Sequence, residues 1–227
     1  SLNTLDKVIK FSKSKEIKRG RLIYCPPYTL ISSFSKKFKN CQIGIGGQNC
    51  HENESYGPYT GSINSRMLKN IGAQFVIIGH SENREKGENN KLINLKIKSA
   101  LEAKLKVIFC IGESLTDKRK KKTQSILSKQ IKVGLDSIKN KSSIFIAYEP
   151  VWAIGSGITP KSKDLFKTVE FIKSKFKDKS PKVLYGGSVN PQNITNLKEI
   201  NNIDGFLIGG ASQNTNKFID IVKKTYS

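Results

Sequence analysis

The chain has 227 residues, of which 37% are hydrophobic and 26% are charged, as in ordinary folded proteins. This composition excludes collagen-like, coiled-coil and fully disordered chains, and no apolar run is long enough for a transmembrane helix. The net charge of +22 comes from 35 lysines and only 5 arginines. Because the lysines are scattered, they indicate a biased genome composition more than a specific nucleic-acid interface.

Seven short apolar runs predict strands, and helical patterns alternate with them. The runs are nearly continuous, as expected of strands buried on both faces of a parallel sheet. They cover residues 22–25, 42–45, 75–78, 107–111, 144–148, 183–185 and 206–208. The alternation predicts the α/β class. No composition shift or linker divides the chain, so we expect a single domain over residues 1–227.

The first helical pattern, about residues 2–14, has no strand before it. A closed barrel of eight βα units needs that strand. The count of seven strands and eight helices therefore predicts a (β/α)8 barrel whose first strand is missing from this sequence. An open doubly wound sheet is the alternative. Two helix starts are predicted at Thr159-Pro160 and Asn190-Pro191, with proline as the first helical residue.

Polar or glycine-rich clusters follow most of the predicted strands. In a parallel barrel these strand ends form one face, where active sites are built. Gly186-Gly187-Ser188 and Gly209-Gly210 follow the last two strands. Glycine lets backbone N–H groups approach an anion closely, and a helix N-terminus favours negative charge. A phosphate site is therefore predicted there, although two tight strand-to-helix turns would show the same pattern.

His80 and Glu149 are the candidate reactive side chains. His80 directly follows the third strand and opens a polar cluster that includes Glu82, and Glu149 ends the fifth strand. A carboxylate at a buried strand end can have its pKa raised toward neutrality and act as a base. A structural histidine and a surface glutamate are the alternatives.

The segment after Glu149 predicts a lid over these strand ends. It runs from Pro150 to Pro160 and contains Trp152 and the glycines 155 and 157. A proline at each end would limit the hinges, and glycines would let the segment move.

No metal and no cofactor are predicted. The four cysteines form no CxxC pair, and with only two histidines a zinc site is poorly supported. Free thiols are typical of a reducing cytoplasm, and the first residues show no apolar core of signal-peptide length. The expected location is therefore cytoplasmic.

Four motifs stand out, at residues 79–82, 148–155, 185–189 and 205–212. Together they resemble the triosephosphate isomerase family, and the resemblance covers essentially the whole chain. The resemblance implies a TIM barrel and a cofactor-free enzyme of glycolysis and gluconeogenesis that interconverts dihydroxyacetone phosphate and glyceraldehyde 3-phosphate. This family is itself a standard example of pKa tuning and loop closure. It further implies a phosphorylated triose substrate, a homodimer or higher homo-oligomer, and neither a membrane nor a specific nucleic-acid partner.

The resemblance also implies a role for individual residues. Glu149 matches the base, His80 the imidazole that polarises the carbonyl, and Glu82 the carboxylate that supports a catalytic lysine. The matching phosphate donors are Gly155, Ser188, Gly209 and Gly210. The matching lid residues are Pro150, Trp152, Gly157, Pro160 and Tyr185. Residues 49–61 match a loop that docks into the partner subunit, with Asn49, Thr60 and Gly61.

Three departures from the family pattern stand out. The family's first strand carries an Asn-x-Lys motif with the catalytic lysine, and residues 1–3 resemble the residues that come just after that motif. Asn83 and Ser62 replace an arginine and an acid that pair across the family's dimer interface. Pro160 has no N–H for Tyr185 to latch at the lid's far hinge.

The missing motif leaves a second interpretation open. All four phosphate donors lie far along the chain from the missing strand, so the 227-residue chain is expected to bind phosphate but to turn over poorly. The alternative function is thus a catalytically impaired phosphate-binding barrel. A basic nucleic-acid-binding protein is the weaker alternative.

Overall fold

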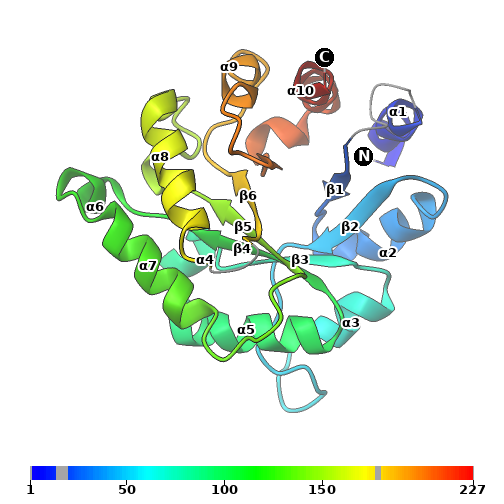
Figure 1. Cartoon of the computed structure of the whole chain (residues 1–227). Helices are drawn as coiled ribbons and strands as arrows, with labels where there is room; N and C mark the ends of the chain where they lie inside the picture. Colours follow the sequence, from blue (N-terminus) through cyan, green and yellow to red (C-terminus); the bar gives the residue numbers. More distant parts are fainter. Residues whose placement is uncertain (1, 14–19, 177–179, 227) are drawn as a thin grey trace.

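The computed structural model describes residues 2–13, 20–176 and 180–226 (Figure 1). Its seven strands form one sheet in the order of the sequence, and each strand is parallel to its neighbours. They are β1 (Leu22–Tyr24), β2 (Ile43–Gly47), β3 (Phe75–Ile78), β4 (Lys106–Ile111), β5 (Ile144–Tyr148), β6 (Lys182–Tyr185) and β7 (Gly205–Phe206). The seven apolar runs thus predicted all seven strands of the described chain.

The register of the sheet brings the carboxyl ends of the strands together. Ile78 pairs with Phe109, Ile111 with Tyr148, and Tyr148 with Tyr185. The residues that follow these strand ends therefore meet along one edge of the curled sheet.

Helices line the outer face of the curled sheet (Figure 1). They are α1 (Leu2–Ser12), α2 (Tyr28–Lys37), α3 (Ser65–Asn70), α4 (Ser81–Glu85), α5 (Asn90–Glu102), α6 (Leu115–Arg119), α7 (Thr123–Gly134), α8 (Ser162–Lys173), α9 (Ile194–Lys198) and α10 (Thr215–Tyr226). The described residues thus form ten α-helices, where eight were predicted. Short helices account for part of this difference in number. α4 follows β3 and is capped by His80, and α6 follows β4 and is capped by Ser114; each has five residues. None of the helices in the described ranges has the length and apolar character needed to cross a bilayer.

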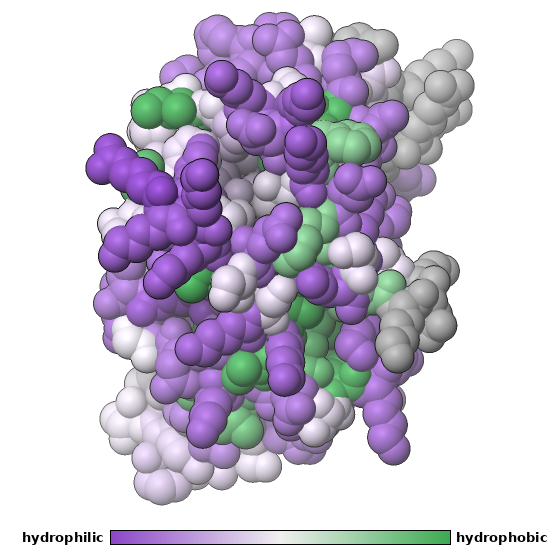
Figure 2. All heavy atoms as spheres, turned by 60° about the vertical axis from the view of Figure 1, so that its left-hand side comes forward, coloured by the Kyte–Doolittle hydropathy of each residue, from purple (hydrophilic) through white to green (hydrophobic). Residues whose placement is uncertain are grey.

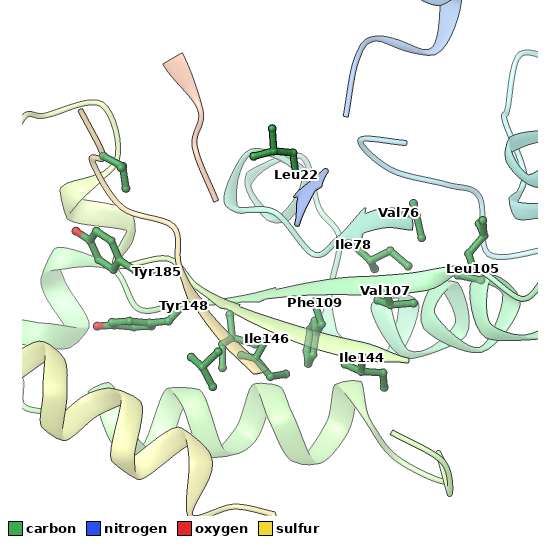
Figure 3. Close-up of a cluster of buried hydrophobic side chains, with 14 of the residues drawn as sticks. Leu22, Val76, Ile78, Leu105, Val107, Phe109, Ile144, Ile146, Tyr148 and Tyr185 are labelled. Atoms are coloured by element: carbon green, nitrogen blue, oxygen red, sulfur yellow. The ribbon is translucent and has the colours of Figure 1, made fainter. Parts of the chain in front are cut away.

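Apolar side chains fill both faces of the sheet. Ile78, Phe109 and Ile146 belong to the large cluster between the sheet and the helices (Figure 3). A second cluster on the inner face is formed by Ile77, Ile108, Cys110 and Ala147, which alternate along the strands with the first set. Each large side chain of this kind stabilises the fold by roughly 1.5–3 kcal/mol when fully buried. This two-sided burial explains why the strand sequences are continuously apolar.

The sheet does not close within the described residues. β1 and β7 are its edges, and α1 packs against α10 beside the gap between them (Figure 1). A doubly wound sheet would reverse its strand order part-way along the chain, whereas this order is strictly sequential. The predicted barrel lacking its first strand is therefore confirmed, and the doubly wound alternative is wrong.

Both predicted helix starts are wrong by a few residues. After Thr159 and Pro160 the backbone stays extended, and α8 begins only at Ser162. Lys161, whose backbone is still non-helical, is the N-cap of α8, and the helix buries Leu165, Val169 and Ile172. The side chain of Asn190 does accept two backbone N–H groups, but these belong to a turn that precedes α9.

Candidate active site

His80 stands at the junction of β3 and α4. Its backbone is the N-cap of α4, and its Nδ1 accepts a hydrogen bond from the N–H of Glu82 at 3.3 Å. A ring nitrogen that accepts a hydrogen bond carries no proton, so in the neutral ring Nε2 is the protonated nitrogen. Nε2 lies 3.3 Å from Oε1 of Glu149. The imidazole therefore presents an N–H donor to the centre of the strand-end face.

Glu149 follows the last residue of β5 and is only 2% exposed. Its Oε2 accepts the backbone N–H of Ser81 at 3.2 Å, while Oε1, which lies 3.3 Å from Nε2 of His80, has no hydrogen-bond partner among the described residues. Burial raises the pKa of Glu149, and His80, the Cys110 thiol, the Ser81 N–H and Arg84 oppose that rise. A buried carboxylate with a raised pKa and one unpartnered oxygen has the properties of a general base.

Two glycines make room for this carboxylate. A Cβ atom on Gly112 would lie 1.7 Å from the backbone oxygen of Glu149, and one on Gly186 would lie 2.9 Å from its Cγ. Real Cβ contacts are never so short, so only glycine fits at Gly112 without movement of the β5 end. The strand ends of β4 and β6 thus define the position of Glu149 from both sides.

Arg84 ties the ends of β3 and β4 together. Its guanidinium donates to the carbonyl oxygens of Gly79 at 2.7 Å and Cys110 at 3.0 Å, and to Oδ1 of Asn90 at 2.7 Å. Burial lowers the pKa of Arg84, and the nearby Glu149 opposes this change. Gly79 directly precedes His80, and Cys110 is one of the groups that lower the pKa of Glu149, so Arg84 holds residues that act on both candidate reactive groups.

The base of the lid is anchored on Glu113, directly after Gly112. The Glu113 carboxylate accepts the Tyr148 hydroxyl at 3.1 Å and the Trp152 Nε1–H at 3.0 Å, and its backbone oxygen accepts the Val151 N–H at 3.1 Å. Burial raises the pKa of Glu113 despite these bonds. One buried carboxylate thus joins β5, which carries the base, to the first turn of the lid, η2 (Val151–Ala153).

The lid reaches the first phosphate loop. Ser188 Oγ donates to the Ala153 carbonyl at 2.7 Å and accepts the Gly157 N–H at 3.1 Å. Gly155 and Gly157 both have positive φ angles, 67° and 73°, which favour glycine at these positions. The lid therefore folds toward the strand-end face and contacts Ser188, one of the residues predicted to hold phosphate.

The other predicted phosphate donors lie at the end of β7. Gly209 and Gly210 are exposed, and Gly210 begins η3 (Gly210–Gln213). The Gly209 carbonyl accepts both the N–H and the hydroxyl of Ser212, but neither glycine N–H is used in a hydrogen bond among the described residues. Exposed and unused N–H groups at a helical turn are suitable donors to an anion.

Tyr185 and Pro160 do not meet through a hydrogen bond. The Tyr185 hydroxyl is buried without a partner, and its ring packs so closely on Gly187 that a Cβ there would lie 2.3 Å from the hydroxyl oxygen. Burial raises the pKa of Tyr185. Pro160 is the last residue of the lid and lies outside any helix or strand.

The remaining predicted residues have different surroundings. The carboxylate of Glu82 is exposed and forms no ion pair with a described residue. Asn49 points into the protein: its Nδ2 donates to Glu88 at 2.8 Å, and its Oδ1 accepts from Lys96, which itself pairs with Glu88. Thr60 and Gly61 are exposed at the far end of the same loop. Among the described residues, no three His, Cys, Asp or Glu side chains are grouped to hold a metal.

Comparisons with known proteins identify the family of the chain. A family model described as triosephosphate isomerase matches residues 2–225. The chain belongs to the triosephosphate isomerase family. It is 42% identical to the triosephosphate isomerase of Dictyoglomus thermophilum over 225 residues, covering 95% of this chain and 89% of that one. The enzyme of Thermodesulfovibrio yellowstonii is 41% identical over 231 residues, with 98% and 92% covered.

A solved structure extends the match to three dimensions. The crystal structure of triosephosphate isomerase from Bartonella henselae is 34% identical, with a TM-score of 0.89 and coverage of 100% of this chain and 94% of that chain. Family membership therefore rests on sequence and fold together.

The sequence analysis missed the residues that support the two candidate groups. Arg84, Gly112 and Glu113 were not among the predicted site residues. The contacts that matter for the site are remote in sequence: Cys110 is 26 residues from Arg84, and Trp152 is 39 residues from Glu113. The one local signal was their position, because each lies within a few residues of a strand end.

Proposed function

We propose that this member of the isomerase family interconverts dihydroxyacetone phosphate and glyceraldehyde 3-phosphate, with Glu149 as the base. The observation that carries the proposal is the pairing of two groups at one strand-end face. An unpartnered oxygen of buried Glu149 lies 3.3 Å from the His80 Nε2, whose tautomer is set by the Glu82 N–H.

The chemistry depends on these two groups. Glu149 takes a proton from the substrate carbon next to the carbonyl, and the His80 Nε2–H donates a hydrogen bond to the carbonyl oxygen, where negative charge develops. The hydroxyl proton passes to the former carbonyl oxygen, and Glu149 returns its proton to the neighbouring carbon of the enediolate, so no proton is gained or lost overall. The raised pKa of Glu149 helps the transfer, because a base with a pKa nearer that of working pH is more effective.

The substrate phosphate would bind at the glycine-rich ends of β6 and β7. Ser188 and the N–H groups of Gly155, Gly209 and Gly210 are the proposed donors. The lid would cover the bound substrate and exclude water, with Pro150 and Pro160 at its ends and Trp152, Gly157 and Tyr185 taking part in its closure. The contact between Gly157 and Ser188 at 3.1 Å supports this role, since it joins lid and phosphate loop.

We also infer a homodimer or higher homo-oligomer. The loop that carries Thr60 and Gly61 exposes Tyr56 (68%) and Tyr59 (38%), and exposed aromatic side chains are typical of interfaces. At this interface Asn83 and Ser62 would meet without charge, which avoids a buried unpaired ion. The four cysteines are free, which supports the proposed cytoplasmic location.

Solvent hydrogen exchange tests the proposed reaction directly. Incubation of triose phosphate with the protein in heavy water should place deuterium on the carbon from which Glu149 removes a proton. Glu149→Gln should abolish both exchange and isomerisation, and the same change at exposed Glu199 is the matched control. Full exchange by the Glu149→Gln protein would exclude Glu149 as the base.

A further inference from the structure

Trp152 is held at the foot of the lid by two groups from one segment. Its indole N–H donates to Glu113 at 3.0 Å, and the ammonium of Lys118 lies 3.3 Å from the centroid of its ring. Glu113 lies in the connection between β4 and α6, and Lys118 lies on α6, five residues later. One short segment therefore contacts both the polar edge and the face of the same indole.

The segment is built to keep Lys118 in place. α6 begins with a capping box in which the Ser114 hydroxyl accepts the Asp117 N–H at 3.1 Å and the Asp117 carboxylate accepts from Ser114. A capping box stabilises a helix start and defines the angle at which the chain enters. The cap residue directly follows Glu113, so the two contacts with Trp152 are positioned relative to each other.

Lys118 differs from the rest of its basic run. Residues 118–122 are all cationic, and the side of the molecule that carries α6, α7 and α8 is largely hydrophilic (Figure 2). Lys120, Lys121 and Lys122 are exposed, whereas Lys118 is half-buried on the indole. Lys118 forms no ion pair with a described residue, so its charge is directed to the ring and toward Glu113. A cation over tryptophan is the strongest of the side-chain cation–π pairs.

We propose that Lys118 is a positioning residue of the lid: its ammonium holds Trp152 in the docked position from which the lid reaches Ser188. Ala153 and Gly157, which contact Ser188, follow Trp152 within five residues. Displacement of the indole would therefore move the lid's phosphate-side contacts. This inference rests on the proposed function, because it assigns Lys118 to the same lid and the same phosphate site.

The expected effect falls on binding more than on chemistry. If the docked lid is only partly populated without Lys118, the apparent affinity for a phosphorylated ligand falls by that population. Once the ligand is bound, its own contacts hold the lid, so the chemical step changes little. Loss of the cation–π contact should weaken binding of glycerol 3-phosphate, a non-reacting analogue, by about 3- to 10-fold. KM should rise by the same factor while kcat stays within about twofold.

Trp152 is the one tryptophan of the chain, so its fluorescence reports this contact without any assay of activity. Lys118→Met removes the charge but keeps an unbranched side chain, Lys118→Arg keeps the cation, and Lys120→Met removes an exposed charge of the same run. Only Lys118→Met should change the ligand-free emission spectrum and increase quenching by neutral acrylamide. Lys118→Arg should restore both emission and analogue binding.

Three outcomes would overturn the proposal. In the first, Lys118→Met keeps wild-type emission and wild-type affinity for glycerol 3-phosphate. In the second, Lys120→Met weakens binding as much as Lys118→Met does, which would indicate general attraction of the anion by net charge. In the third, Lys118→Met weakens binding by the full factor even in a Trp152→Phe background. This would mean that Lys118 does not act through Trp152, since the effects of two coupled residues are not additive. Normal fluorescence changes combined with absent isomerisation would contradict the proposed function alone.

Discussion

The centre of the sheet and its two edges are built differently. β3 to β6 have four to six residues each and pair along most of their lengths, whereas β1 has three residues and β7 has two. Backbone groups on the open side of an edge strand have no partner within the sheet. His80 and Glu149 follow central strands, while Gly209 and Gly210 follow the edge strand β7. The proposed reactive groups thus follow strands that are paired on both sides. Part of the proposed phosphate site follows a strand that is paired on one side only.

This difference corrects one argument from the sequence. The phosphate donors lie far from the missing strand along the chain, but β7 is next to the open side of the sheet. Distance in sequence was therefore a poor guide for Gly209 and Gly210, while Gly155 and Ser188 do lie after the inner strands β5 and β6. Phosphate affinity of the 227-residue chain should depend mostly on the second pair.

The largest effect is expected at the centre, from Glu149→Asp. Shortening the side chain by one methylene moves the base away from the substrate carbon but leaves the phosphate donors in place. We expect kcat to fall by about 10²–10⁴ and KM to change only a few-fold. Steady-state kinetics in both directions measure this. Glu199→Asp on the surface is the control, and a near wild-type kcat for Glu149→Asp would contradict the assignment.

The edge is tested by adding a strand. A version of the chain preceded by a strand with an Asn-x-Lys motif should pair with β1 and β7 and place a lysine near Glu82. We expect its kcat to exceed that of the 227-residue chain by about 10²–10³, the usual value of one preorganised charge or donor. Glycerol 3-phosphate affinity should differ much less. Equal kcat in the two chains would show that another group supplies the charge.

Glycine substitutions compare the two regions directly. Gly112→Ala places a Cβ against the Glu149 backbone at the centre, whereas Gly209→Ala adds one in open space beside the edge. Overpacking costs about 1–3 kcal/mol. We expect Gly112→Ala to lower both the free energy of unfolding and kcat, and Gly209→Ala to leave stability within about 0.5 kcal/mol.

Urea unfolding and kinetics of the two glycine variants provide the measurement. An unchanged unfolding midpoint for Gly112→Ala would mean that the β5 end can shift freely, which would contradict a rigid centre. A destabilised Gly209→Ala protein would mean that the β7 loop is packed more tightly than its open surroundings indicate.

The sequence predicted the strands well and the connections less well. All seven strands were found from continuous apolar runs, which are typical of strands buried on both faces. The edge strands β1 and β7 were found in the same way, although they are less buried than the central strands. Thr159-Pro160 misled because proline permits a helix start but does not require one. Thr159 and Pro160 belong to the lid instead. The position of the lid depends on a hydrogen bond between Gly157 and Ser188, which are 31 residues apart in the sequence.

The candidate site shows the same division. The positions of His80 and Glu149 at the strand ends could be predicted, because Glu149 directly follows an apolar run and His80 follows another after Gly79. Arg84, Glu113 and Lys118 could not, because their importance comes from partners on other elements. A basic run such as residues 118–122 is ordinarily a solvated surface, and only the folded chain distinguishes Lys118 from the rest.

The smallest effect concerns the pH dependence at the centre. Burial raises the pKa of Glu149, and Arg84 is one of the groups that oppose this rise. The base acts only when ionised, so kcat/KM should fall on the acid side as pH drops through the pKa of Glu149. Without Arg84 that pKa rises further, and the acid limb of Arg84→Met should move to higher pH. At pH values well above this limb, kcat/KM of Arg84→Met should be lower than that of the unmodified chain by less than about tenfold.

Arg84→Lys is the control, because it keeps the positive charge but loses the planar guanidinium that binds Gly79, Asn90 and Cys110. Its acid limb should stay near that of the unmodified chain, while its unfolding midpoint falls. An acid limb for Arg84→Met at or below the original pH would show that Arg84 acts on Glu149 through packing alone.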